Sequence, residues 1–76
     1  MSPQDNSALR RRKLAELERA IVTAELRLTQ HLERLEWRRE VGQGTTTAEI
    51  LVHDAEKDLT RLHRRRHELL QAKPDE

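Results

Sequence analysis

Apolar residues recur at alternating steps of three and four along two stretches of this chain. In the first stretch the repeat consists of Leu14, Leu17, Ile21, Ala24, Leu28 and Leu35, with His31 at the same spacing. In the second stretch it consists of Ala48, Val52, Ala55, Leu59, Leu62 and Leu69, with Arg66 at the same spacing. Such a repeat places all its side chains on one stripe of an α-helix. Neither stretch contains an internal Gly or Pro, so the pattern predicts two amphipathic helices.

The two stretches are separated by VGQGTTTAEI, residues 41–50. Gly42 and Gly44 are expected to supply the positive φ angles that end a helix. Thr46 and Glu49 have the spacing of a capping box at the start of the next helix. We therefore predict a first helix at about 7–41, a turn at 42–46, a second helix at about 47–72 and a short polar tail.

A turn this short forces the two helices to lie antiparallel. Folding the chain about it sets Leu35 against Val52, His31 against Ala55, and Leu28 against Leu59. The apolar stripes then meet layer by layer, which predicts an all-α, antiparallel two-helix hairpin of coiled-coil type. The start of the first helix has two alternatives, a cap formed by Ser2 with Pro3 or a later cap within residues 5–7. The first helix is expected to be roughly ten residues longer than the second, which leaves two to three turns unpaired.

The chain has 76 residues and no cysteine, so it has neither the size for a large core nor a disulfide framework. This favours association into a helical bundle, either as a homodimer or with a helix of another protein. Several apolar residues fall off the predicted contact stripe and are the expected partner interface: Val22, Leu26, Leu32 and Trp37. No apolar run approaches the roughly 18 residues of a membrane span, and no signal peptide is recognisable, so we expect a cytoplasmic protein without membrane contact.

The second half of the chain carries the spacing G-x2-T-x2-A-x2-L-x4-E-x2-L-x6-R-x2-L, formed by Gly42, Thr45, Ala48, Leu51, Glu56, Leu59, Arg66 and Leu69. In this spacing, with Leu28 and Leu35 upstream, residues 25–69 resemble short, uncharacterised helical-hairpin proteins of alphaproteobacteria. The resemblance implies the hairpin fold and no assigned activity. Arg38 falls where that pattern has a leucine, and the neighbouring Trp37 is unusual, which indicates that the loop end has its own partner. The architecture is also similar to the hairpin co-chaperones of type III secretion and to the Rop-type RNA-binding hairpin.

No motif in the chain indicates catalysis, a cofactor or a metal site. His63 and His67 have the four-residue spacing of a zinc pair, but three arginines lie between them and disfavour a cation. His31 is interpreted as a partly buried polar residue of the contact stripe, of the kind that fixes register. We therefore expect a protein that is not an enzyme.

Basic residues cluster toward the open end of the predicted hairpin and are candidates for contact with a polyanion: Arg10, Arg11, Arg12, Lys13, Arg64 and Arg65. A small basic nucleic-acid-binding hairpin of Rop-like architecture is therefore the alternative function. Against it, 15 basic and 14 acidic residues leave a net charge of only +1. No aromatic stacking platform accompanies the arginines. The expected function is a non-enzymatic module for protein-protein interaction or structure.

Overall fold

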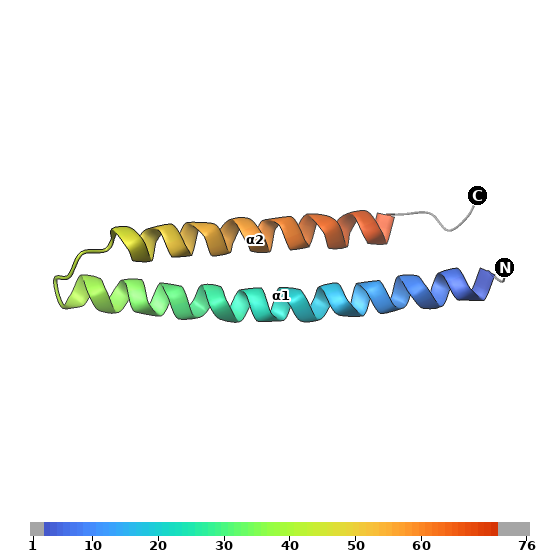
Figure 1. Cartoon of the computed structure of the whole chain (residues 1–76), viewed down its shortest axis with the longest axis horizontal. Coiled ribbons are helices and arrows are strands. Elements are labelled where there is room, and N and C mark those ends of the chain that lie inside the picture. The colour runs from blue at the N-terminus through green and yellow to red at the C-terminus, as the bar shows by residue number, and fades with distance from the viewer. Residues whose placement is uncertain (1–2, 72–76) are drawn as a thin grey trace.

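The chain forms two long antiparallel helices joined by one short turn, as the apolar repeat predicts (Figure 1). The computed structural model describes the backbone of residues 3–71 and the side chains of residues 7–71. Helix α1 spans Pro3–Glu40 and has 38 residues, and helix α2 spans Thr46–Gln71 and has 26. The two lie side by side along the length of α2, and α1 continues past the end of α2 (Figure 1). The described residues therefore form an all-α helical hairpin.

The first helix begins earlier than the predicted boundary at about residue 7. It starts at Pro3, the earlier of the two alternatives. Proline suits the first position of a helix, because it lacks an N–H that would have no partner there. The proposed cap residue Ser2 lies outside the described residues, as do Ala72 and the polar tail.

The turn ends α1 through Gly42 alone, which corrects the prediction for Gly44. Gly42 has a φ of 73°, whereas Gly44 does not adopt a positive φ. The amide of Gly42 donates to the carbonyl of Arg39 at 3.3 Å, and the amide of Gln43 donates to that of Arg38 at 2.9 Å. These two bonds form a Schellman motif, in which a left-handed residue lets the chain satisfy the last carbonyls of a helix.

The start of α2 also differs from the predicted capping box. The amide of Glu49 donates to the carbonyl of Thr45 at 2.8 Å, so Thr45, and not Thr46, is the N-cap. A capping-box glutamate lies three residues after the N-cap, and Glu49 lies four residues after Thr45. Glu49 therefore does not complete a capping box. Its carboxylate instead lies 3.9 Å from the guanidinium of Arg39, across the hairpin.

Arg38, near the end of α1, binds the loop through its side chain. Its Nη1 donates to the carbonyl of Gly44 at 3.4 Å, and its side chain is half-buried. The leucine expected at this position from the resemblance could not make this bond. The loop is thus tied to α1 by a side chain as well as by the backbone.

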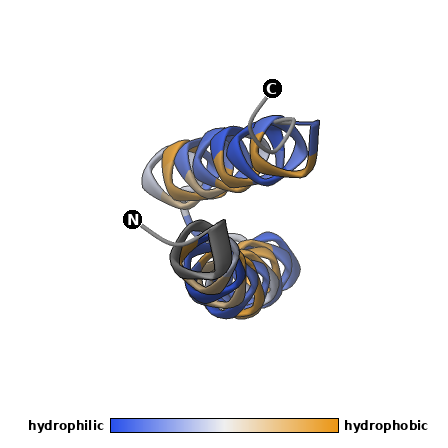
Figure 2. Cartoon of the chain, turned by 90° about the vertical axis from the view of Figure 1, so that its right-hand side faces the viewer, coloured by the Kyte–Doolittle hydropathy of each residue, from blue (hydrophilic) through white to orange (hydrophobic). Residues whose placement is uncertain are grey.

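The packed core lies next to the turn. Leu35, Ala48 and Val52 are buried there, and Leu28 packs against them. Farther along the contact between the two helices, which we call the seam, Ile21 is the only other buried residue among residues 7–71, at 7% exposure. Leu17, Leu62 and the other predicted contact residues there are half-buried. Figure 2 shows short hydrophobic and hydrophilic segments alternating along the ribbon of both helices, as expected when each helix carries one apolar stripe.

The shape explains why so little is buried. The molecule extends 61 × 16 × 13 Å, with a radius of gyration of 17.7 Å. A compact chain of this length would have a radius of about 11 Å. Each helix therefore has a neighbour on one side only. Neither described helix is long and apolar enough to cross a membrane.

Candidate interaction surface

A long groove runs along one side of the contact between the two helices. It consists of two adjoining hollows that share Ala20, Leu62 and Arg65. One hollow reaches toward the turn as far as His31 and Leu51, and the other reaches toward the open end. We name the whole the seam groove, with these lining residues: Lys13, Glu16, Leu17, Ala20, Thr23, Ala24, Arg27 and His31 from α1, and Leu51, Asp54, Ala55, Asp58, Arg61, Leu62, Arg65, Glu68 and Leu69 from α2.

Small residues make the floor of the seam groove. Ala20 and Ala24 on α1 and Ala55 on α2 line it at different levels, and all three are half-buried. Alanine side chains are too short to fill the space between two helix backbones, so the floor stays open to solvent. Leu51 and Leu62 border this floor and are also only half-buried. The groove is therefore an apolar surface that the hairpin by itself does not cover.

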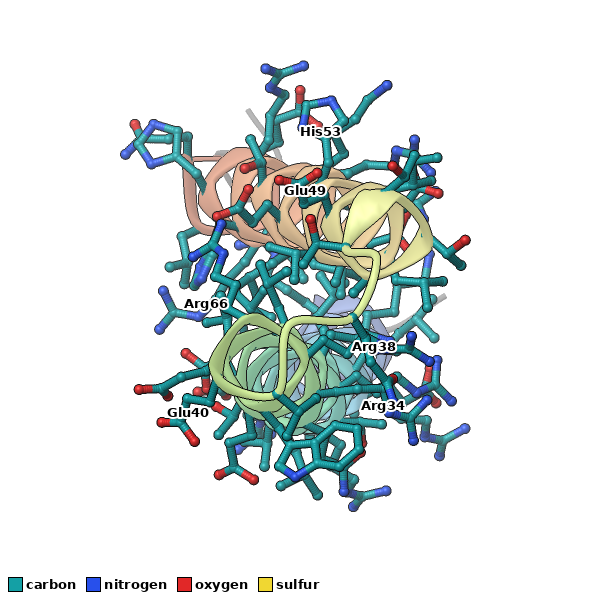
Figure 3. The ribbon with its side chains drawn as sticks, turned by 90° about the vertical axis from the view of Figure 1, so that its left-hand side faces the viewer. Arg34, Arg38, Glu40, Glu49, His53 and Arg66 are labelled. Atoms are coloured by element: carbon teal, nitrogen blue, oxygen red, sulfur yellow. The ribbon has the colours of Figure 1, made fainter. Side chains whose placement is uncertain are left out.

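The two sides of the seam are different. On one side, the guanidinium of Arg66 lies 3.8 Å from the carboxylate of Glu18 and bridges the helices. Figure 3, viewed from the turn, places Arg66 on the side opposite Arg34 and Arg38. Arg34 and Arg38 follow Arg27 by seven and eleven residues, which keeps them on the same face of α1 as this groove-lining residue. One side of the seam is thus bridged by charge, and the other is hollow.

Charged residues form the rims of the seam groove. On α2 the rim runs from Asp54 and Asp58 near the turn to Arg61 and Arg65 farther away, and all four are exposed. Asp58 and Arg61 form an ion pair at 3.8 Å within the helix. From Asp54 to Arg65 the acidic residues therefore lie nearer the turn and the basic residues farther from it, and Glu68 follows toward the open end.

His31 lies in the seam groove on the α1 side, beside Ala55, as the register predicts. Its side chain is half-buried. A small neighbour leaves the imidazole room, which is the reason a polar group fits at this level of the seam.

The four residues predicted as the partner interface are all exposed. The exposed fractions are 63% for Val22, 58% for Leu26, 44% for Leu32 and 53% for Trp37. Val22, Leu26 and Trp37 share the back of α1, but Leu32 lies roughly 120° around the helix from Leu26. Trp37 borders a shallow hollow with Gln30, Glu33 and Arg34. That these residues bind a partner stays a prediction.

The predicted basic residues do not gather into one patch. Arg10, Arg11, Arg12 and Lys13 are consecutive on α1, and they point around the helix because each step turns by roughly 100°. Arg64 borders a separate shallow hollow of α2 with His53 and Lys57. Only Lys13 and Arg65 share a groove, and Glu16 and Glu68 line it with them. Contact with a polyanion stays a prediction.

The seam groove is the feature that the apolar repeat did not reveal. The sequence contained a partial signal, because Ala20 lies beside the stripe that carries Ala24 and Leu28. Within residues 7–71 no three His, Asp or Glu side chains lie close enough to hold a metal ion, and no buried side-chain nitrogen or oxygen lacks a hydrogen bond. Comparison of the chain with protein-family models, with curated proteins and with solved structures finds no significant match.

Proposed function

We propose that this protein is a non-enzymatic, helix-packing interaction module in the cytoplasm. Its apolar seam is completed by a helix of another polypeptide, which is either a second copy or part of a larger complex. The observation that carries the proposal is the seam groove, an apolar trough with charged rims that runs along most of α2.

The energetics of a two-helix hairpin support the proposal. Ordering the backbone costs roughly 1 to 2 kcal/mol per residue, and burial of apolar surface must offset that cost. Among residues 7–71 only Ile21, Leu35, Ala48 and Val52 are buried, and one of these is an alanine. A third or fourth helix in the groove would bury the half-exposed leucines as well. Short chains without disulfides commonly gain stability in this way.

The form of the surface fits a helix better than a small ligand. The groove is straight, open and as long as several helical turns, and it has a floor of alanines. Small side chains let a second helix approach closely, and ridges of larger side chains fit such grooves. Charged rims select the partner, since opposite charges must meet along both edges.

Site-specific photocrosslinking in the native cell, with the protein at its native level, tests the proposal. A photoreactive amino acid replaces Leu62 in the seam groove, Leu26 on the back of α1, or His53 on the exposed outer face of α2. We expect a discrete crosslinked species from position 62 and none from position 53. Its mass separates a second copy from a different protein. A discrete species from position 26 alone would move the module's contact to the back of α1. No discrete species from either 62 or 26 would refute the helix-packing function.

A further inference from the structure

We propose that the seam groove binds a second copy of this same chain, turned end for end, to form a four-helix bundle. In this dimer α2 packs against α2 of the second copy and α1 against α1, with the two turns at opposite ends. The inference rests on the proposed function and names its partner. It is carried by the order of charges along both rims of the groove.

The charges along the α2 rim are complementary to those of a second α2 that runs in the opposite direction. The midpoint between Asp54 and Arg65 coincides with the midpoint between Asp58 and Arg61, and both fall between Leu59 and Thr60. A twofold axis at this point sets Asp54 opposite Arg65 of the second copy and Asp58 opposite Arg61. Because the contact is isologous, each of these pairs occurs twice. Four ion pairs then line one edge of the interface.

The α1 rim gives the same twofold axis independently. Glu16 lines the groove near the open end, and Arg38 lies on the same face near the turn. The midpoint between them is Arg27, which also lines the groove. Reversal about Arg27 sets Glu16 opposite Arg38 of the second copy, which adds two more ion pairs.

The two axes coincide only if Arg27 and the α2 midpoint are level in the hairpin. Two ion pairs fix that register, Arg39 with Glu49 near the turn and Glu18 with Arg66 toward the open end. Counting equal numbers of residues inward from each pair sets Arg27 opposite residues 57–61. The α2 midpoint lies within about half a residue of the centre of this interval. The order of charges on α1 and the order of charges on α2 therefore give the same twofold axis.

The groove is large enough for a dimer interface of small buried area. A helix of 26 residues is about 39 Å long. With a molecular width of 16 Å, the face covers roughly 600 Å² per copy, or about 1,200 Å² for the pair, the lower end of specific stable interfaces. The reversed copy also brings its turn, with the exposed Val41, over the overhang of α1 that carries the exposed Leu9.

One contact in this arrangement is repulsive. Arg27 lies on the axis and meets Arg27 of the second copy, while Asp58 of both chains lines the groove at the same level and offsets part of the repulsion. The alternative dimer, with both turns at one end, sets Arg27 against Asp58 of the second copy and Arg34 against Asp54. It makes four ion pairs instead of six and leaves Glu16 and Arg38 unpaired. The reversed arrangement is therefore the one we infer.

Charge reversal on α2, measured by sedimentation equilibrium, tests the pairing. We expect the native chain to be a dimer at micromolar concentration. The variant D54R/D58R and the variant R61D/R65D should each dissociate at least about 100-fold more easily, because like charges then face each other along the edge. Mixed together, the two variants should form a heterodimer, since every α2 pair is again of opposite charge. The variant E25R/E56R changes the net charge by the same amount as D54R/D58R and is the matched control, and it should remain a dimer.

The control and all charge variants change exposed residues, so circular dichroism should report the same helix content. A single substitution, Arg27→Leu, should tighten the dimer, because it removes the repulsive contact. Dimers of D54R/D58R as stable as the native one, or no heterodimer on mixing, would overturn the inferred pairing.

The direction of the second copy is tested by the distance between turns. Gln43→Cys supplies the only cysteine for a spin label, and pulsed electron resonance should give about 50 Å between labels in the reversed dimer. A distance below about 20 Å would establish the arrangement with both turns together and refute ours. A native chain that is monomeric throughout the micromolar range would also refute the dimer. The proposed function would survive that result if position 62 crosslinks to a different protein in the cell, and would fail with it only if nothing crosslinks.

Discussion

The turn end and the open end of this hairpin have the same apolar periodicity, yet the turn end holds three of the four residues that are buried among residues 7–71. Near the turn, Leu35, Ala48 and Val52 are buried, and Arg39 pairs with Glu49 across the helices. Toward the open end, Leu17 and Leu69 occupy equivalent positions of the repeat and are half-buried. Periodicity therefore assigns a face to each residue without fixing how much of that face is covered.

Two physical causes separate the ends. The short turn holds the helices together at one end, so contacts made there require little further loss of chain entropy. The seam also changes in composition. The turn end has Val52 against Leu35, whereas the open half has Ala24 in an equivalent position and Ala20 beside it. Small side chains fill the interhelical space poorly, and the seam groove results.

Truncation of equivalent leucines at the two ends should give the largest difference. Leu35→Ala removes a side chain that is 6% exposed, and we expect a loss of about 2 to 3 kcal/mol in the free energy of unfolding. Leu17→Ala should cost roughly 1 kcal/mol, because its side chain is already half in solvent. Urea unfolding followed by circular dichroism, at one fixed protein concentration, measures both. Equal losses would show that the two ends are packed alike in solution.

The two glycines of the turn should also differ. Gly42→Val places a β-branched residue at a φ of 73°, and we expect a loss of about 1 to 2 kcal/mol. Gly44 has no positive φ, and an added Cβ would meet no atom within 4 Å, so Gly44→Val should change stability by less than about 0.5 kcal/mol. Thermal unfolding of both variants gives the comparison. A larger loss at Gly44 would mean that the Schellman motif at Gly42 is not what ends α1.

A tryptophan reporter can compare the two ends in the proposed dimer. Trp37 is the only tryptophan and is 53% exposed on the back of α1, so its emission should stay that of a solvated indole on dilution. In a Trp37→Phe background, Leu17→Trp places the reporter in the seam groove, and its emission should shift to the red as the dimer dissociates. A red shift of Trp37 itself on dilution would instead support the interface predicted from Val22, Leu26, Leu32 and Trp37.

The smallest effects should come from the two ion pairs that span the hairpin. Glu49→Gln at the turn end and Glu18→Gln at the open end each remove one partner of a largely exposed pair. We expect each to lower stability by less than about 0.5 kcal/mol, and less still in 1 M salt. Double-mutant cycles with Arg39→Gln and Arg66→Gln isolate the pair energies. A coupling above about 1 kcal/mol at the open end would show that charge, and not packing, holds that end closed.

Much of the fold follows from local features of the sequence. The repeat from Leu14 to Leu35 predicts a helix and its inner face, and the groove places His31 beside Ala55 as the repeat requires. The sequence predicts the bounds of the turn to within a residue or two, but it does not identify the residues that end α1 and cap α2. Choice of Gly42 over Gly44, and of Thr45 over Thr46 as the cap, depends on the path by which the chain reaches α2. That path is set by both helices together.

The sequence by itself determined two helices, their antiparallel order and the residues that face each other, because these depend on side-chain spacing along one chain. Only the tertiary structure decided that Glu49 pairs with Arg39, that Glu18 and Arg66 bridge one side of the seam, and that the other side stays open. The distance between two helices depends on the volumes of side chains from both of them at each level. The seam groove, and the charged rims that border it, therefore appear only once α1 and α2 are packed together.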